Sequence, residues 1–321
     1  MTIAIPSYQR RDPVLRLLRG LDEQVGDSAE LRHDLDVVVV LDGSTDGSRE
    51  AIESERWNVP VRVVWQPNRG LAAARNVGLA AAAGGLVWFL DDDLVPAAGL
   101  LEQHRRAHDP GSPSVVVGRC RIPRGSDAPE PYLLWWNDFY EAMKDEAVIT
   151  RFDRFTAANT SAPAAALDAV GGFDESIVGY GLEDYELAIR LLAAGTLIRF
   201  DKDAVAWHPD VPARSVLVGR ERSLGCNAAR IANLHPETAD ILFPRTSVSP
   251  PRRFIHRLGI RQPRSLMLLS RVSYALSHLT GSAHVTTSRR AEHLARAAAH
   301  AAGVAEGDPE GKLLSRVLDG H

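Results

Sequence analysis

Residues 86–93 have the sequence Leu-Val-Trp-Phe-Leu-Asp-Asp-Asp. Five consecutive apolar residues are typical of a strand covered on both faces, as in a parallel sheet. Three carboxylates follow at once, where this strand ends. Because ligands of open parallel sheets bind beyond the carboxyl ends of the strands, the sequence predicts a ligand site at Asp91, Asp92 and Asp93.

The 85 residues before this stretch repeat the same alternation of strand and helix. Apolar runs predict strands at 2–5, 36–41 and 61–65, and the 36–41 run contains four consecutive valines. An apolar stripe after Asp12-Pro13, a turn before Ser48 and an alanine-rich stretch at 71–83 predict three helices. This order predicts a mostly parallel, Rossmann-like α/β sheet with helices on both faces.

The pattern after residue 96 is less regular. We expect a strand at 115–122, an aromatic-rich helix at 131–144, helices at 163–170 and 182–194, and strands at 196–200 and 204–207. From about residue 211 the pattern is mainly helical, and residues 244–290 contain nine arginines and no acidic residue. We therefore divide the chain into 1–209, with halves at 1–96 and 97–209, and an arginine-rich helical extension at 210–321.

Charge is distributed unevenly along the 321 residues. The net charge of −4 divides into −11 before residue 210 and +7 from there on, and it gives no case for nucleic-acid binding. The two cysteines, Cys120 and Cys226, support neither a disulfide framework nor a thiolate zinc site. With no visible signal peptide or membrane span, we expect a cytoplasmic protein.

The acidic residues at the strand ends permit two interpretations. Three adjacent carboxylates repel one another unless a cation is present, and Mg²⁺ prefers oxygen ligands; the alternative is a solvated, helix-capping turn. Asp42 ends the second strand and either forms a turn or accepts hydrogen bonds from a base. Tyr8 follows the first strand and could stack on that base.

Five segments in order resemble an inverting family 2 glycosyltransferase of the GT-A fold. They are Ile-Pro-Ser-Tyr-Gln-Arg (5–10), Val-Leu-Asp-Gly-Ser-Thr-Asp (40–46), Asn-Arg-Gly-Leu-Ala-Ala-Ala-Arg-Asn (68–76), Phe-Leu-Asp-Asp-Asp (89–93) and Gly-Tyr-Gly-Leu-Glu-Asp-Tyr-Glu-Leu-Ala-Ile-Arg-Leu (179–191). The likeness covers roughly residues 2–208. It implies that 1–96 is the nucleotide-binding half and 97–209 the acceptor-binding half of a catalytic domain.

The resemblance also implies roles for single residues. It implies binding of the nucleotide-sugar, UDP-linked by preference, by Pro6, Ser7, Tyr8, Arg10, Asp42, Asn68, Arg75, Asp91 and Asp92. Mn²⁺ or Mg²⁺ would be held by Asp93, Asp91 and His208, although a lone histidine is as often a plain structural residue. The acceptor would contact Glu183, Asn159, Tyr180 and Trp135, of which Asn159 could equally belong to a polar loop and Trp135 to the core.

Asp184 would be the general base that takes the proton of the acceptor hydroxyl. It lies in the first turn of a predicted helix, and we expect the helix dipole to keep the carboxylate ionised at neutral pH. A single displacement would invert the anomeric centre. A retaining transferase and a non-catalytic sugar-nucleotide-binding protein stay open, whereas a sugar-1-phosphate nucleotidyltransferase would need a glycine-rich loop that Pro6-Ser-Tyr-Gln-Arg10 is not.

The expected partners are the donor and a hydroxyl-bearing acceptor, which is a glycan, a glycolipid or a secondary metabolite. The acid-free stretch 244–290 is either a solvated helical face or a contact with an anionic acceptor, with the inner face of the cell membrane or with a second copy of the chain.

Overall fold

The computed structural model describes residues 1–26, 28–108, 113–123, 136, 138–210, 212, 214–243, 273 and 285–308. The chain forms two units. The first comprises residues 1–176 and 183–211, and the second comprises 177–182 and 212–321.

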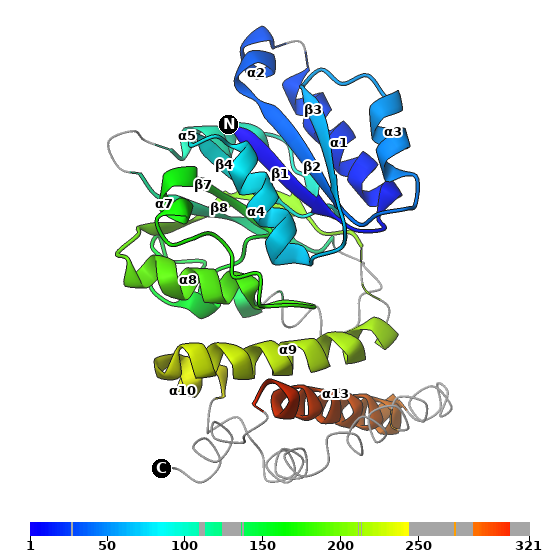
Figure 1. The fold of residues 1–321 in the computed structure, drawn as a ribbon, viewed down its shortest axis with the longest axis vertical. Helices are drawn as coiled ribbons and strands as arrows, with labels where there is room; N and C mark the ends of the chain where they lie inside the picture. Colours follow the sequence, from blue (N-terminus) through cyan, green and yellow to red (C-terminus); the bar gives the residue numbers. More distant parts are fainter. Residues whose placement is uncertain are drawn as a thin grey trace. The chain divides into compact units, whose positions relative to one another are not determined.

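An eight-stranded sheet forms the centre of the first unit (Figure 1), in the order β3-β2-β1-β4-β7-β6-β8-β5. Only β7 and β5 run against the other six strands. The strands are β1 (Thr2–Ser7), β2 (Asp36–Asp42), β3 (Val61–Gln66), β4 (Leu86–Leu90), β5 (Val95–Pro96), β6 (Val115–Arg121), β7 (Asn159–Pro163) and β8 (Ile198–Trp207).

Helices cover this sheet because its central strands are apolar on both faces. The four valines of β2 are all buried, and Val38 and Val40 pack against Ala74 of α4. Gly78 brings α4 close to the sheet, since a Cβ there would lie 2.5 Å from the Cβ of Ala4. The helices of this unit are α1 (Arg11–Val25), α2 (Ala29–Asp34), α3 (Ser48–Ser54), α4 (Leu71–Ala81), α5 (Leu100–Arg106), α7 (Ala164–Asp168), α8 (Glu183–Ala193) and the 3₁₀ turn η1 (Phe152–Arg154).

The structure contains α2, α5 and β5, which the sequence did not predict, and it differs from the prediction in two further segments. β8 is a single strand where two were expected. The Asp201 carboxylate accepts hydrogen bonds from the N–H groups of Asp203 and Ala204, and these bonds keep the polar residues 201–203 within the strand. The pairing with β6 shifts register beside Gly118. The polar residues from Asn159 form β7, which pairs antiparallel with β4. Of the expected helix at 131–144, residues 131–135 and 137 lie outside the described part of the chain.

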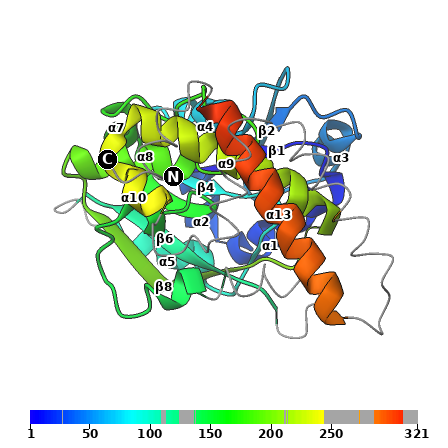
Figure 2. The same ribbon diagram turned by 90° about the horizontal axis from the view of Figure 1, so that it is seen from below.

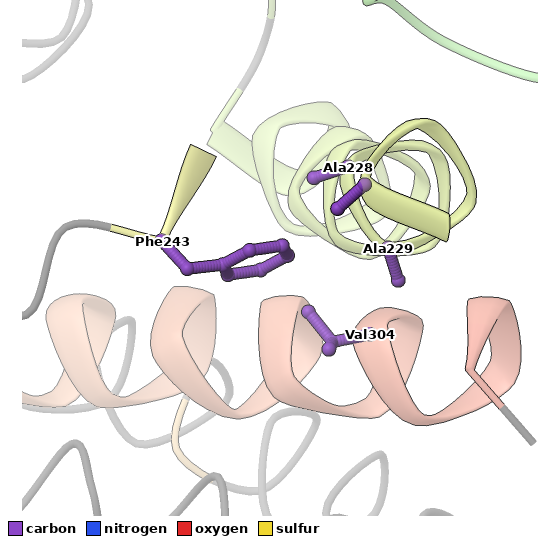
Figure 3. Close-up of a cluster of buried hydrophobic side chains, with 5 residues drawn as sticks. Ala228, Ala229, Phe243 and Val304 are labelled. Carbon is purple, nitrogen blue, oxygen red and sulfur yellow. The ribbon is translucent and has the colours of Figure 1, made fainter. Parts of the chain in front are cut away.

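The second unit contains α9 (Arg214–Leu234), η2 (Pro236–Thr238), α10 (Ala239–Leu242) and α13 (Val285–Gly307). α9 and α13 lie side by side (Figure 2). Gly225 and Gly303 permit this approach, because a Cβ at either would lie within 2.1 Å of a carbonyl oxygen of the other helix. Figure 3 shows Phe243 and Val304 pointing into the space between these helices.

The described helices include none with the length and apolarity needed to cross a bilayer. Most of the arginine-rich stretch at 244–290 falls outside the described residues, so the interpretations given for it stay predictions.

Candidate functional site

The carboxyl ends of β1, β2 and β4 meet at one edge of the sheet. Ser7 is in register with Leu41, the residue before Asp42, and β4 runs parallel to β1. The run from Asp91 to Asp93 follows β4 directly. Parallel pairing therefore collects the acidic residues of distant segments, as the sequence predicted.

Asp42 anchors the start of α4. Its Oδ1 accepts hydrogen bonds from Gln66 Nε2 at 2.7 Å and from Arg69 N at 2.8 Å, and its Oδ2 accepts one from Gly70 N at 2.8 Å. A carboxylate at a helix N-terminus satisfies donors that have no partner within the helix. Asp42 therefore has a structural role, and one lone pair of Oδ2 is left for a ligand.

Asp93 lies between a cation and an imidazole. Its Oδ2 accepts a hydrogen bond from Arg10 Nη1 at 2.7 Å and lies 3.5 Å from His208 Nε2. His208 follows β8, and its N–H donates to the carbonyl oxygen of Arg121 at 2.7 Å. The structure thus brings together two of the three residues predicted to bind metal, although 115 positions separate them.

The donor set of this pair fits a divalent cation. A carboxylate oxygen and an imidazole nitrogen are both ligands of Mn²⁺-type ions, and such ions complete their coordination with water and substrate phosphates. Within the described residues, no cluster of three or more histidine, cysteine or acidic side chains could hold a metal. Asp91, the third predicted ligand, is bonded to Arg75 instead.

Asp92 is the buried member of the acidic run. Burial and the neighbouring Asp93 raise its pKa well above the usual value, and Arg10, 3.8 Å away, opposes them. Asp92 is buried, whereas the side chain of Asp91 is 30% exposed. The three adjacent carboxylates therefore have three different environments.

Arg75 of α4 joins Asp91 to α8. Its side chain is only 2% exposed, and it donates from Nη2 to Asp91 Oδ1 at 2.8 Å and from Nη1 to Glu183 Oε1 at 2.5 Å. The two carboxylates raise the pKa of the guanidinium despite its burial. The structure therefore pairs Arg75 with carboxylates, where the resemblance implied contact with a nucleoside.

Asp184 is the second residue of α8, next to Glu183. Burial and the Glu183 carboxylate raise its pKa to about 7, while Arg75 and the N–H of Tyr185 act in the opposite direction. The helix dipole was expected to keep this carboxylate ionised at neutral pH; desolvation and a like charge oppose it, so the ionised and protonated forms are both present near pH 7. A group with a pKa near 7 is suited to proton transfer at neutral pH.

Asn159 lies inside the core. It is 0% exposed, its Oδ1 accepts hydrogen bonds from Trp88 Nε1 and faces His104 Nε2, and its Nδ2 donates to the carbonyl of Ala204. These contacts engage the amide on both sides and leave it no surface for an acceptor. The predicted acceptor contact is therefore wrong for this residue.

The remaining predicted residues lie in different surroundings. Pro6 and Ser7 are buried in β1, whereas Asn68 is exposed and Tyr8 is 51% exposed, so its ring can receive a ligand. Tyr180 belongs to the second unit, where its ring lies 4.2 Å from the guanidinium of Arg220. Trp135 lies outside the described residues.

Trp136 shares with Trp135 two interpretations from the sequence, a ring for a sugar face or part of the core, but only Trp135 was predicted to contact the acceptor. The ring centroid of Trp136 lies 5.4 Å from that of His208, and the ring stacks on Tyr140 at 5.5 Å. The spacing of four residues between Trp136 and Tyr140 places both on one helix face, and that signal could have favoured Trp136 over its neighbour.

Comparison with known proteins shows which family this chain belongs to. The sequence matches the family described as glycosyl transferase family 2 over residues 2–166, more than half of the chain. Residues 138–205 also match the family described as N-terminal domain of galactosyltransferase. A validoxylamine A glucosyltransferase of Streptomyces hygroscopicus subsp. jinggangensis is 30% identical over 273 residues, covering 76% of this chain and 63% of that protein. The chain thus spans less than two thirds of this relative.

Two solved structures share the fold. The mannosyltransferase PcManGT of Pyrobaculum calidifontis, in complex with GDP-Man and Mn²⁺, has a TM-score of 0.58 at 22% identity, covering 95% of this chain and 86% of that one. S. aureus TarS 1–349, in complex with UDP-GlcNAc, has a TM-score of 0.52 at 17% identity, covering 96% and 90%. The chain has the GT-A fold, and it belongs to glycosyl transferase family 2.

Proposed function

We propose that this protein is a metal-dependent, inverting glycosyltransferase that moves a sugar from a UDP-sugar to an acceptor hydroxyl by single displacement. Two observations carry the proposal: the Asp93–His208 pair at the sheet edge, and the Asp184 carboxyl of α8, whose pKa burial and Glu183 raise to about 7. Arg75 joins the strand end that carries Asp91 to the helix that carries Asp184.

The donor half of the site is the edge formed by β1, β2 and β4. Tyr8 supplies an exposed ring for a base, and the free lone pair of Asp42 supplies an acceptor for a base N–H. Asp93 and His208 would hold the divalent cation, which stabilises negative charge on a leaving diphosphate when bound. TarS with UDP-GlcNAc and PcManGT with GDP-Man support a nucleotide-sugar donor, and the choice of UDP is part of the proposal.

The acceptor half centres on Asp184. Its ionised carboxylate accepts the proton of the acceptor hydroxyl as the hydroxyl oxygen attacks the anomeric carbon. The bond from that carbon to the diphosphate oxygen breaks, and the electron pair leaves with the nucleoside diphosphate. General base catalysis of this kind contributes roughly 10²–10⁴-fold. Attack opposite to the leaving group inverts the anomeric centre.

The acceptor is a hydroxyl-bearing glycan, glycolipid or small metabolite. The relative from Streptomyces, named for glucosylation of validoxylamine A, supports a small-molecule acceptor among these.

A donor panel tests the proposal. The full chain with Mn²⁺ is screened by thermal shift against UDP-glucose, UDP-GlcNAc, UDP-galactose, GDP-mannose and dTDP-glucose, and the binding donors are then assayed for transfer to a library of hydroxyl acceptors. Transfer from a UDP-sugar with inversion at the anomeric carbon, read by NMR of the product, supports the proposal. Retention of the anomeric configuration identifies a retaining transferase, and donor binding with no transfer or donor hydrolysis identifies a sugar-nucleotide-binding protein.

A further inference from the structure

Arg75 is a buried cation that bridges two elements of the first unit. It belongs to α4, Asp91 follows β4, and Glu183 begins α8. The ring centroid of Phe173 lies 5.5 Å from its guanidinium carbon and covers one side. A buried charge is tolerated only when it is well paired, so this arginine fixes the distance between its two carboxylates.

We propose that Arg75 is a positioning residue for Asp184. Arg75 holds α8, the base helix that carries Asp184, at the donor edge, and its positive charge favours the ionised form of the base. The proposal rests on the proposed transferase activity, because it assigns Asp184 the role of base. No contact between Arg75 and a substrate is required. Its effect reaches the reaction through the placement and ionisation of Asp184.

The charges around Asp184 come from three elements. Glu183 and the N–H of Tyr185 lie beside it on α8, and the charges of Arg75 on α4 and of Asp91 at the end of β4 also act on it. Glu183 and Asp91 favour the protonated carboxyl, whereas Arg75 favours the carboxylate. Removal of Arg75 and neutralisation of Glu183 should therefore shift the ionisation of Asp184 in opposite directions.

The same helix contains a matched arginine–glutamate pair. Arg190 donates from Nε to Glu186 Oε1 at 2.8 Å, and its Nη1 donates to the carbonyl of Val170. The Glu186 side chain, 4% exposed, is slightly more buried than that of Glu183, which is 6% exposed. Both members of this second pair belong to α8, so it stabilises the helix without a bond to Asp91.

The test compares Arg75→Met, Arg75→Lys, Glu183→Gln and Arg190→Met in the full chain. For each variant, kcat and KM are measured from pH 5.5 to 9 with UDP-glucose, or with whichever donor the panel identifies. In Arg75→Met the acid limb of the profile should move up by about one pH unit, and kcat should fall more than the donor KM rises. In Glu183→Gln the acid limb should move to lower pH. Arg75→Lys should have a higher kcat than Arg75→Met.

Arg190→Met separates positioning from plain stability. It should lower the melting temperature and leave the pH profile in place. The proposal is overturned if Arg75→Met and Arg190→Met have the same pH profile, or if Glu183→Gln and Arg75→Met shift the limb in the same direction. If Arg75→Met does not fold, Arg75→Gln, which removes the charge and keeps a polar side chain, replaces it in the comparison with Glu183→Gln.

A second measurement does not depend on transfer. The carboxyl carbon of Asp184, assigned by comparison with Asp184→Asn, is titrated by ¹³C NMR in the wild-type chain and in the same variants. Opposite shifts of its pKa for Arg75→Met and for Glu183→Gln, with a smaller shift for Arg75→Lys because lysine keeps the positive charge, support the charge-setting role even if no donor is turned over. Wild-type inactivity across the panel would count against the transferase, whereas an unmoved carboxyl titration would count against Arg75.

Discussion

Arg10 and Arg75 both bind carboxylates of the candidate site, but they differ in burial. Arg10, beside Asp93, has a side chain that is 34% exposed, whereas Arg75, between Asp91 and Glu183, is 2% exposed. The Arg10–Asp93 pair is partly buried, since the Asp93 side chain is 13% exposed, and replacement of its arginine by another cation should cost less than loss of the more deeply buried Arg75. Removal of one partner of a buried pair leaves an uncompensated charge and costs about 3–5 kcal/mol. The donor edge is therefore suited to an exchangeable cation, and the base helix to a fixed geometry.

Removal of divalent cations is the strongest way to test the donor half of this comparison. We expect EDTA to abolish transfer, and excess Mn²⁺ or Mg²⁺ to restore it, because Arg10 cannot also neutralise the phosphates of a donor. Product is measured by mass spectrometry, so that no coupling enzyme depends on the metal. Full activity in EDTA would show that Arg10 and the protein donors suffice without a cation.

Asp184→Asn tests the base half. The amide keeps the size of the side chain and cannot accept the proton, so kcat should fall by about 10²–10⁴-fold. Affinity for UDP with Mn²⁺, measured by calorimetry, should stay unchanged, because the donor edge is intact. The matched control is Asp203→Asn, an exposed position in β8. A rate close to that of the wild type would place the base elsewhere.

The sequence predicted the parts of this fold that depend on short-range patterns. The apolar run at 86–90 and the four valines of β2 form strands, and all of these side chains except that of Leu86 are buried. The acidic run was likewise found from its place after a strand, whereas the roles of Glu183 and Asp184 were implied by the family resemblance.

What the sequence could not predict depends on packing between distant segments. Nothing near Arg75 in the sequence indicates that its partners are Asp91 and Glu183, 16 and 108 residues away. Asn159 resembled a loop residue because the three groups that enclose its amide, two side chains and one backbone carbonyl, lie in separate elements. The direction of the Asp184 pKa follows from desolvation, which no local pattern reports.

Asp42→Ala tests whether the third carboxylate of the donor edge serves the fold or the ligand. Loss of its three hydrogen bonds should lower the free energy of unfolding by about 1–3 kcal/mol. If its free lone pair also binds a base, affinity for UDP should fall by about 10–100-fold, since a hydrogen bond to a charged group contributes about 1.5–3 kcal/mol.

The control for Asp42 is Asp46→Ala. Asp46 accepts hydrogen bonds from Ser48 N and Arg11 N in the neighbouring loop, so its loss should destabilise the chain without affecting UDP. Equal UDP affinities for the two variants would limit Asp42 to its role at the start of α4.

The pH dependence of transfer gives the smallest effect and tests the base helix without a mutation. Asp184 accepts a proton only when ionised, and burial together with Glu183 raises its pKa to about 7. The value of kcat/KM for the acceptor should therefore rise with pH, reach half of its plateau near pH 7, and at pH 6 be about one tenth of the plateau. An Asp184 with an ordinary pKa would give a flat profile from pH 5.5 to 8. That result would show that burial does not raise the pKa of the base, and the contrast in burial between the base helix and the donor edge would then have no effect on catalysis.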